Sequence, residues 1–409
     1  MRDQPIARIL AFGDELILGR TVDTNSAWLA RMLGDRGFRV DRLQVVGDRQ
    51  EDGEAALRAA VDGAALVVTT GGLGPTDDDR TRHALAAVMG VPLAANAAAW
   101  RVVTAYWRRL RRGAPPASNR RQALVPPGAA VLDNDRGTAP GLLARVDDCH
   151  VACLPGVPHE MQAMAERLGD RLAGLVPRLQ VPIVRELYLC GLGESSAQEL
   201  IGTLMTDRDP QVGITASELG HLCLRVVGSK AEVTRRTAAL RAALAAYLLP
   251  AAGVAASLVE TLASQKATVA IAESCTVGLV AAQLGAVPGA SRVLREALVA
   301  YHPEVKTRRL GVAPELMLSQ GVVSAAVAQA MAEGVRHRTG ADLALATTGL
   351  AGPDGGDATT PVGTVWIAAT WRGRTVTRQA SLKGTRERIQ RRAAAQALVL
   401  GWEVVSGRP

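Results

Sequence analysis

The stretch AALVVTTGGLGPT (64–76) decides the fold of this chain, and ADLALATTGLAGPDGG (341–356) repeats its design in the second half. In both, an apolar strand pattern ends in two threonines and runs into a glycine-rich turn. Glycine permits positive φ and close approach to a ligand, so N–H groups at such a turn can bind an anion. Two such turns predict two domains, each binding a phosphorylated ligand at the carboxyl edge of a sheet. On spacing alone, an ordinary tight turn is an equally good interpretation.

Strand and helix patterns alternate around the first turn. Strand patterns at 6–12, 38–46 and 64–70 are separated by helix patterns at 26–34 and 51–61, and another helix pattern follows at 79–89. This alternation predicts βαβ units and a parallel sheet. The expected fold class is α/β, with two three-layer α/β domains at 1–170 and 255–409 and a small α+β unit at 171–250.

The composition narrows the functional classes. The 409 residues are 48% hydrophobic and 21% charged, as in a globular protein. No apolar run reaches the ~18 residues that a membrane span needs, and we expect neither a signal peptide nor a membrane partner. Five cysteines without a CxxC pair predict reduced thiols in a cytoplasmic protein. The net charge of +8 is spread along the chain, so no nucleic-acid partner is expected.

The second half carries a candidate nucleophile, Ser274, in ESCT (273–276). A serine where a strand gives way to a helix lies beside free N–H groups that can hold an oxyanion, although it can also simply cap the helix. Tyr301 and Lys306 lie in YHPEVK, at a second such junction. Only four of 47 basic residues are lysines, and a partly desolvated lysine can serve a hydroxyl nucleophile as a base. The alternative is a half-buried tyrosine and a solvated lysine without chemical roles.

Six motifs, ESCT, YHPEVK, GVVS, TGLAGPDGG, PVGTVW and KGTR, make residues 255–405 resemble the nicotinamide-nucleotide amidohydrolase domain. The resemblance implies conversion of nicotinamide mononucleotide to nicotinate mononucleotide and ammonia, without a cofactor. It implies Ser274 as nucleophile, with Lys306 and Tyr301 moving its proton. The implied substrate-binding residues are Thr276, Thr348, Gly349, Ala351 and Gly352, with Arg386 on the phosphate.

The chain departs from this family at several positions. Val277 stands where the family has the first glycine of ESCTGG, and a valine would be strained if that position requires positive φ. YHPEVK replaces YSNEAK and brings in His302 and Pro303, and Thr385 replaces an aspartate. Cys275 is a rival nucleophile, for which only His302 is a candidate activating base.

Polar residues surround the first glycine turn. The residues expected to cradle phosphate are Gly71, Gly72, Gly74 and Thr76. Asn25 and Ser26 are interpreted either as substrate contacts or as helix caps.

Carboxylates near this turn are candidate ligands of a divalent metal. Asp78 and Asp79 begin the next helix, and Asp14 and Glu15 follow the first strand. Carboxylate oxygens suit a hard cation, and pyrophosphate cleavage needs charge neutralisation. The alternative for the helix-start carboxylates is stabilisation of the helix dipole.

The motifs GDELILGRTVDTNS, VVTTGGLGPTDDD, GTAPG and LPGVPHEM make residues 6–170 resemble a molybdopterin-binding-like domain. With its middle unit, which looks KH-like, the whole chain resembles the CinA (competence/damage-inducible) family. For the N-terminal domain this implies hydrolysis of ADP-ribose-type pyrophosphates with a divalent metal. The middle unit lacks a GxxG loop, so its likeness to KH domains concerns shape and RNA binding is not expected.

The leading prediction is a hydrolase of pyridine-nucleotide recycling with two activities, acting on small nucleotides as a homo-oligomer. One alternative is a C-terminal site silenced by the departures at Val277, His302 and Pro303, which leaves only the pyrophosphatase. The other is a non-catalytic pterin- or nucleotide-binding regulatory protein.

Overall fold

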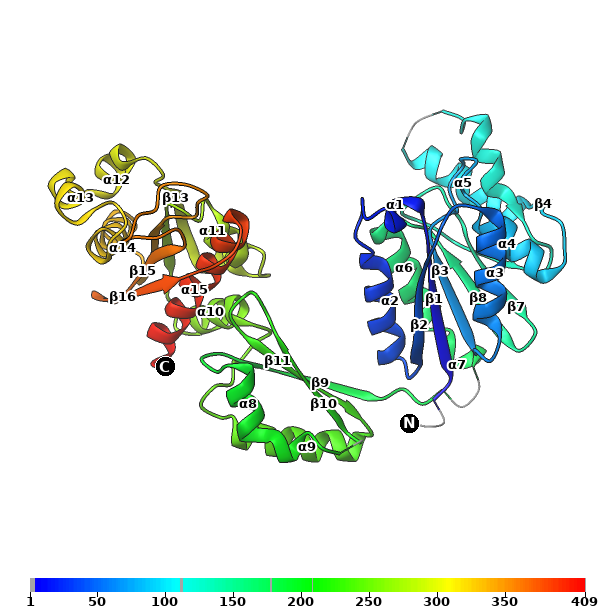
Figure 1. The fold of residues 1–409 in the computed structure, drawn as a ribbon, viewed down its shortest axis with the longest axis horizontal. Coiled ribbons are helices and arrows are strands. Elements are labelled where there is room, and N and C mark those ends of the chain that lie inside the picture. The colour runs from blue at the N-terminus through cyan, green and yellow to red at the C-terminus, as the bar shows by residue number, and fades with distance from the viewer. Residues whose placement is uncertain (1–3, 111–112, 177–178, 208, 409) are drawn as a thin grey trace. The chain divides into compact units, whose positions relative to one another are not determined.

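The computed structural model describes residues 4–110, 113–176, 179–207 and 209–408. It divides the chain into two compact units, Met1–Pro182 and Ile183–Pro409, whose elements are labelled in Figure 1. Within the described ranges, no helix is both long enough and apolar enough to cross a membrane. All five cysteines are free thiols in this structure.

The first unit is built on one six-stranded sheet. Its strands are β1 (Ile6–Phe12), β2 (Arg39–Val46), β3 (Leu66–Thr70), β6 (Ala130–Leu132), β7 (Gly141–Val146) and β8 (Cys149–Leu154), and β4 (Ala94–Ala95) pairs separately with β5 (Leu124–Val125). Its helices are α1 (Asp14–Ile17), α2 (Thr24–Asp35), α3 (Gln50–Val61), α4 (Thr81–Met89), α5 (Ala97–Arg109), η1 (Ala117–Ala123), α6 (Pro158–Gly169) and α7 (Leu172–Leu175).

The sheet has the order β2-β1-β3-β8-β7-β6, with its first four strands parallel. Because neighbouring residues of a strand point to opposite faces, β1 contributes to two cores. Ile9 packs with α2 and α6 on one side, and Leu10 packs with α3, α4 and α5 on the other. The unit is therefore the three-layer α/β domain expected from the sequence.

The second unit contains two sheets. Its strands are β9 (Ile183–Leu189), β10 (Gln211–Ala216), β11 (Leu222–Gly228), β12 (Val269–Glu273), β13 (Leu294–Val299), β14 (Leu343–Gly349), β15 (Thr364–Trp371) and β16 (Arg374–Ser381). Its helices are α8 (Glu194–Ile201), η2 (Gly202–Leu204), α9 (Lys230–Ala243), α10 (Val254–Ser264), α11 (Leu279–Gly285), η3 (Ala290–Arg292), α12 (Pro303–Leu310), α13 (Pro314–Gln320), α14 (Ala325–Thr339) and α15 (Arg386–Ser406).

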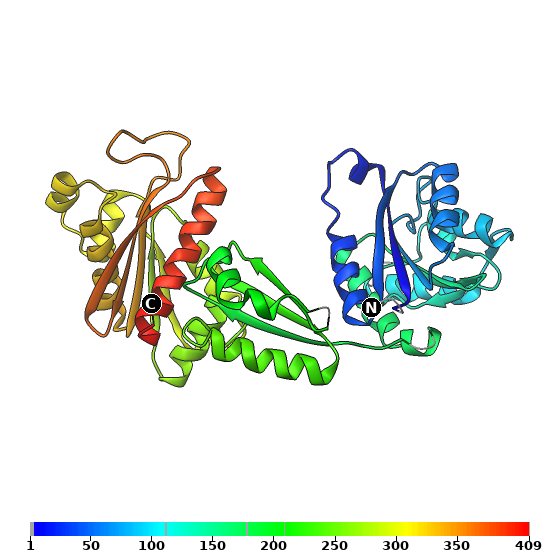
Figure 2. The ribbon, with the colours of Figure 1, turned by 60° about the horizontal axis from the view of Figure 1, so that its bottom comes forward.

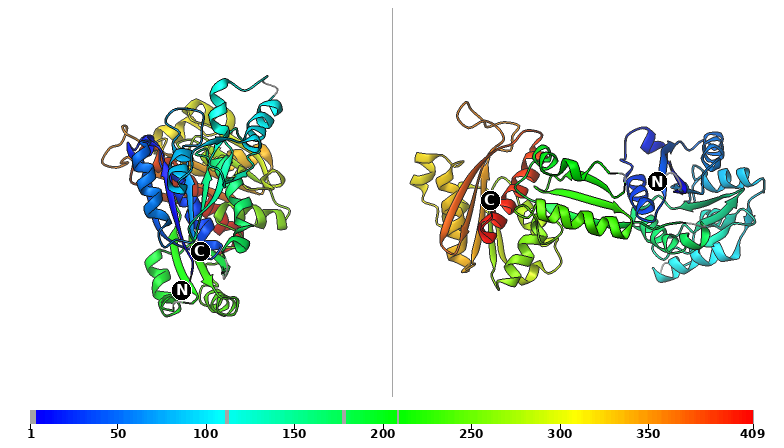
Figure 3. Two further views of the ribbon diagram at one scale, coloured as in Figure 1. Left: turned by 90° about the vertical axis from the view of Figure 1, so that its right-hand side faces the viewer. Right: turned by 90° about the horizontal axis from the view of Figure 1, so that it is seen from below.

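The smaller sheet, β10-β11-β9, is antiparallel and packs its core against α8 and α9 (Figure 3). The α+β unit also packs against the core around the larger sheet. Cys190, just after β9, is buried in the core of the larger sheet, and Gly220 lies so close to α15 that a Cβ there would be 2.7 Å from Val399. The α+β unit and the last domain therefore form one compact body.

The larger sheet has the order β13-β12-β14-β15-β16, in which the first three strands are parallel. Helices α12, α13 and α14 cover one face, and α10, α11 and α15 cover the other (Figure 2). The carboxyl ends of β13, β12 and β14 consequently meet at one edge. ESCT, YHPEVK and the second glycine turn all follow these three strands.

Candidate active site

Lys306 and Ser274 form a hydrogen-bonded pair at this edge. Ser274 follows β12, and Lys306 lies on α12, which begins shortly after β13. The Lys306 side chain is 0% exposed, and its Nζ donates to Ser274 Oγ at 2.9 Å. Nζ also donates to the carbonyls of Ala300 at 2.8 Å and Tyr301 at 3.1 Å. The backbone after β13 thus aims the amine at the serine hydroxyl, and a solvated Lys306 is ruled out.

Burial changes the acidity of the groups in this site. Desolvation lowers the pKa of the Lys306 ammonium to about 8, so the neutral amine is accessible near neutral pH. Desolvation also raises the pKa of the Cys275 thiol to about 12. Because a thiol reacts as its thiolate, the burial of Cys275 and its raised pKa argue against Cys275 as the nucleophile.

The turn that carries Ser274 is held by Glu273, a residue that the sequence analysis did not single out. The buried Glu273 carboxylate accepts hydrogen bonds from the N–H groups of Gly278, Val280 and Ala281 at 2.9–3.1 Å. These groups belong to the start of α11, so they are not free to hold an oxyanion beside Ser274. The expectation that the helix start supplies the oxyanion site is wrong for these three donors.

Thr276 lies beneath the site. It is fully buried, and its hydroxyl bonds to the Glu273 carboxylate at 2.6 Å and to Thr347 Oγ1 at 2.8 Å. The substrate-binding role predicted for its side chain is therefore wrong, because that side chain links β12 to β14.

Val277 adopts the left-handed conformation that the missing glycine suggested. Its φ is +48°, and its side chain is 49% exposed. For a β-branched residue this is a strained backbone conformation. The expectation of strain at this turn is confirmed, and the turn still brings Ser274 to Lys306.

Arg386, the first residue of α15, connects the two remaining parts of the site. Its guanidinium donates to the carbonyl of Gly352 at 2.6 Å and to the Tyr301 hydroxyl at 3.0 Å. The hydroxyl of Tyr301 thus faces Arg386 and forms no hydrogen bond with Ser274 or Lys306. This geometry therefore does not support the predicted proton-moving role of Tyr301. It places Tyr301 beside Arg386, the residue proposed to bind the phosphate.

The second glycine turn is anchored by its own backbone. Leu350 N–H donates to Thr364 O at 2.9 Å, and Gly352 has a φ of +79°. The Thr348 hydroxyl, predicted to bind substrate, is buried and donates to Val322 O at 2.8 Å. Gly349 and Ala351, the other turn residues predicted to bind substrate, contribute backbone atoms at the edge of the site. Gln390, which the sequence analysis missed, lies one helical turn beyond Arg386 and donates to Cys275 O at 2.8 Å.

A second candidate site lies at the carboxyl edge of the first unit's sheet. A cleft of about 590 Å³ opens there and is bordered by the first glycine turn. Its lining includes Gly13, Glu15, Asp48, Gly71, Gly72, Gly74, Asp78, Asp79, Gln122, Thr138 and Glu160. This position agrees with the rule that ligands of α/β sheets bind at the carboxyl ends of strands.

Glycine is required in this turn mainly because a side chain would not fit there, and less because its N–H groups are free. Gly71 has a φ of +97°, and a Cβ there would lie 2.4 Å from Phe12 O. Its N–H donates to Leu154 O, and the N–H of Gly74 donates to Asp79. Within the described ranges, Gly72 and Leu73 keep N–H groups without an acceptor, so the predicted phosphate cradle is smaller than expected.

Asp79 is a structural residue of this turn. Its carboxylate accepts hydrogen bonds from Gly74 N at 2.6 Å, Thr76 N at 2.8 Å and Thr76 Oγ1 at 2.5 Å. These bonds engage the Asp79 carboxylate and the Thr76 hydroxyl within the turn, so this geometry does not support the predicted metal-ligand role of Asp79 or the predicted substrate role of Thr76. The buried Arg82, not foreseen from the sequence, closes the turn by donating to the carbonyls of Leu73 and Gly74.

The other acidic residues approach one another without forming a ready-made metal site. Asp14 and Asp48 exchange backbone-to-carboxylate hydrogen bonds at 3.1 and 3.2 Å. Burial, followed by the charges of Asp14, Glu15 and Asp78, raises the pKa of Asp48. In the part of the chain that the structure describes, no three acidic, histidine or cysteine side chains are grouped to hold a metal ion. The predicted metal ligands do not fit such a site as they stand.

Asn25 and Ser26 lie outside the lining of this cleft. Asn25 Nδ2 donates to Thr70 Oγ1 at 3.0 Å and to Gly156 O at 2.8 Å, and so ties α2 to two strand ends. Asp23 is the residue that caps α2, by accepting from Ser26 N–H. The helix-cap interpretation of Asn25 and Ser26 is therefore wrong, and a substrate contact of either residue stays a prediction.

Fold and sites together define the class: an α/β protein with a buried serine–lysine pair on one sheet and a glycine-bordered cleft on another. The sequence matches the family of CinA C-terminal domains over residues 251–404 and that of probable molybdopterin-binding domains over 8–174. A CinA-like protein of Gemmatimonas aurantiaca is 38% identical over 411 residues, covering 95% of this chain and 94% of the relative. The chain belongs to the CinA family.

Two further relatives are similar. A putative competence-damage inducible protein of Moorella thermoacetica is 37% identical over 413 residues, covering 97% of this chain and 98% of the relative. The crystal structure of CinA from Thermoplasma acidophilum, described as of unknown function, is 33% identical with a TM-score of 0.39. It covers 42% of this chain and 99% of its own.

Proposed function

We propose that the C-terminal domain hydrolyses the carboxamide of nicotinamide mononucleotide. The hydrogen bond between Lys306 Nζ and Ser274 Oγ, in a buried setting, carries the proposal. A hydroxyl is a weak nucleophile unless a base takes its proton, and a lysine whose pKa is lowered to about 8 is such a base. The membership of the chain in the CinA family supports the same reaction.

In the proposed reaction, this pair and water make and break the bonds. The neutral amine of Lys306 accepts the hydroxyl proton as Ser274 Oγ attacks the carboxamide carbon. The ammonium then returns the proton to the leaving nitrogen, which departs as ammonia and leaves an ester on Ser274. Water attacks the ester with Lys306 again as base, which releases nicotinate mononucleotide and restores the serine. Arg386, beside Tyr301, supplies a cation for the phosphate of the substrate.

Ammonia release from nicotinamide mononucleotide tests this proposal. Wild type should release ammonia, and both Ser274→Ala and Lys306→Arg should lose the activity, since a guanidinium keeps its proton at working pH. Lys266→Arg, at an exposed lysine of the same domain outside the motifs, is the matched control and should keep it. Absence of release by folded wild type would refute the amidohydrolase and favour a C-terminal site silenced by the sequence departures.

We also propose that the N-terminal cleft binds and cleaves an ADP-ribose-type pyrophosphate. The cleft offers the N–H groups of Gly72 and Leu73 to a phosphate, at the sheet edge where such ligands bind. The carboxylates of Glu15, Asp48 and Asp78 also line the cleft and would be available to a divalent metal that enters with the substrate. Because those side chains do not preassemble a metal site, substrate oxygens and water would have to complete its ligand set.

Formation of AMP from ADP-ribose, with and without a chelator, tests the second activity. Asp48→Asn should reduce AMP formation, because Asp48 lines the cleft, and the exposed Asp52→Asn on α3 should not. If wild type forms no AMP with any divalent metal added, the pyrophosphatase is refuted. Failure of both assays would leave a nucleotide- or pterin-binding protein without catalysis.

A further inference from the structure

Glu160 gives the N-terminal cleft a second polar wall. It lies in the first turn of α6 and lines the same 590 Å³ cleft as Gly72 and Gly74. Its position on α6 distinguishes it from the acidic residues around Asp48, which lie on the segments that follow β1, β2 and β3.

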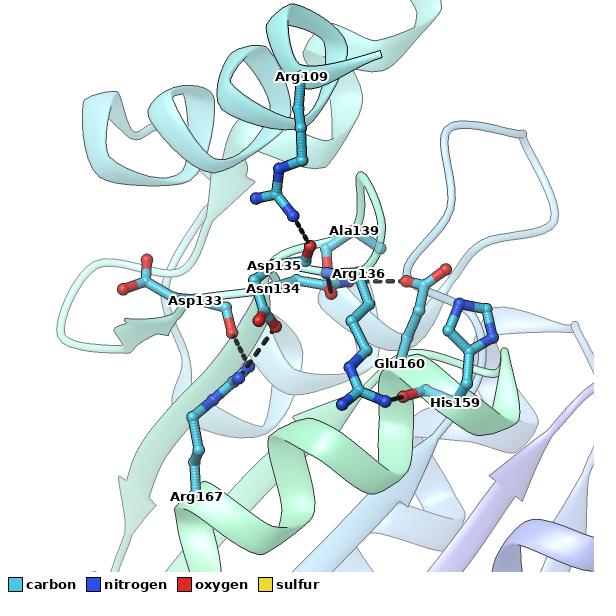
Figure 4. Close-up of polar contacts among 9 residues, drawn as sticks. All are labelled: Arg109, Asp133, Asn134, Asp135, Arg136, Ala139, His159, Glu160 and Arg167. Atoms are coloured by element: carbon cyan, nitrogen blue, oxygen red, sulfur yellow. Dashed lines mark hydrogen bonds and ion pairs between the residues drawn. The ribbon is translucent and has the colours of Figure 1, made fainter. Parts of the chain in front are cut away.

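Two features of the loop before β7 place the Glu160 carboxylate. Asn134, only 5% exposed, donates through Nδ2 to Glu160 Oε2 at 2.6 Å and to Ala139 O at 2.9 Å (Figure 4). The Asn134 amide oxygen accepts from Arg136 N–H, so this side chain is fixed at both ends. Gly137 leaves the necessary room, since a Cβ there would lie 1.9 Å from Glu160 Oε2. A buried asparagine, and a glycine where a Cβ would displace it, thus hold one carboxylate at the cleft.

The carboxylate keeps an unused acceptor. Within the described ranges, Glu160 forms no ion pair, and no donor of the protein engages its Oε1. The guanidinium of Arg136 is directed instead to His159 O, as Figure 4 shows. An unpaired carboxylate repels a phosphate and accepts hydrogen bonds, so the ligand part at this wall must carry O–H or N–H donors.

We propose that Glu160 is a specificity-determining residue that accepts hydrogen bonds from the hydroxyl groups of a ribose. A carboxylate oriented by the protein is the usual partner of ribose hydroxyls in nucleotide-binding α/β sheets. The glycine turn then receives the phosphates, and the Glu160 wall receives the adjoining sugar. This inference rests on the proposed binding of a nucleoside pyrophosphate in the cleft, and it assigns the sugar to a residue.

Calorimetric titration of the full chain with ADP-ribose and with inorganic pyrophosphate, with a chelator present to prevent metal-dependent cleavage, tests the assignment. Glu160→Gln keeps the shape of the side chain but loses the charge, and a charge-assisted hydrogen bond is worth enough to weaken ADP-ribose binding roughly 10-fold. Pyrophosphate has no sugar, and its affinity should not fall. Glu166→Gln, at an exposed glutamate of the same helix, is the matched control and should leave both affinities unchanged.

Gly137→Ala provides an independent variant, because it displaces the carboxylate without removing it. It should weaken ADP-ribose and spare pyrophosphate, as Glu160→Gln does. If wild type binds ADP-ribose and Glu160→Gln binds it equally well, the ribose assignment is overturned while the proposed ligand class survives. An equal loss for both ligands also overturns it. If wild type does not bind ADP-ribose, the inference and the proposed function of the cleft fall together.

Discussion

The depressed pKa of Lys306 makes the stability of the second unit depend on pH. An unfolded lysine has a pKa of 10.5, and burial lowers that of folded Lys306 to about 8. Between these values the unfolded chain binds a proton that the folded chain does not, so the free energy of unfolding rises with pH. The gain is absent below pH 8 and complete above pH 10.5. Its full size is about 3 kcal/mol, and about 2 kcal/mol falls between pH 7 and pH 9.5.

Replacing Lys306 by Met removes this titration and keeps an unbranched apolar side chain in the buried site. From pH 7 to pH 9.5, wild type should gain about 2 kcal/mol more unfolding free energy than Lys306→Met. Lys383→Met is the matched control, because Lys383 is exposed and should behave as wild type. Other groups titrate equally in all three proteins, so the differences between them isolate the buried amine.

Pulse proteolysis over a urea gradient measures the unfolding free energy of the second unit in the full chain. The fragment derived from 183–409 is identified by mass, which separates its transition from that of the first unit. If wild type and Lys306→Met gain the same free energy between the two pH values, the amine is not desolvated. The proposed role of Lys306 as a neutral base would then lose its physical basis.

Three other predictions concern the turns. Cys275, whose thiol pKa is raised to about 12 by burial, should resist iodoacetamide in the folded protein at pH 8 and react in urea; rapid native labelling would contradict this. Val277→Asn should raise the unfolding free energy by up to ~1 kcal/mol, because asparagine tolerates a left-handed backbone conformation. Val299→Asn on β13 is the control and should not raise it. Equal effects of the two variants in urea titrations would show that Val277 is not strained. Asp79→Asn should lower the unfolding free energy of the first unit by about 1–3 kcal/mol, because an amide accepts hydrogen bonds at one oxygen where the carboxylate accepts at two. Unchanged hydrogen exchange of the backbone at 72–76 would contradict this prediction.

The candidate residues of the C-terminal site could be found from the sequence, but their roles could not. Ser274 and Lys306 stand out by their junctions and by the rarity of lysine, and they do meet. Tyr301 forms a hydrogen bond with Arg386, which lies 85 positions away in the chain, and no local sequence pattern predicts that contact. Glu273 shows the same limit, because a glutamate beside a serine can point to solvent, to a metal or, as here, to a helix start.

The N-terminal cleft shows why unpaired backbone groups are hard to predict. The sequence locates the glycine turn at the correct strand end, since glycine is required where Phe12 O approaches Gly71. It does not reveal that Asp79 folds back onto the turn and consumes N–H groups counted as free. A carboxylate three to five residues away competes with any ligand for those donors, and only the loop conformation decides between them.

The sequence by itself determined the alternation of strands and helices, the two glycine turns at sheet edges and the family. Periodicity and backbone sterics act over a few residues, so the local sequence contains that information. Tertiary structure alone decided that Lys306 is desolvated and aimed at Ser274, and that Glu160 keeps an unused acceptor in the cleft. Burial and side-chain direction depend on which elements pack together, and so the acidity and the hydrogen-bonding capacity of these groups arise only in the folded chain.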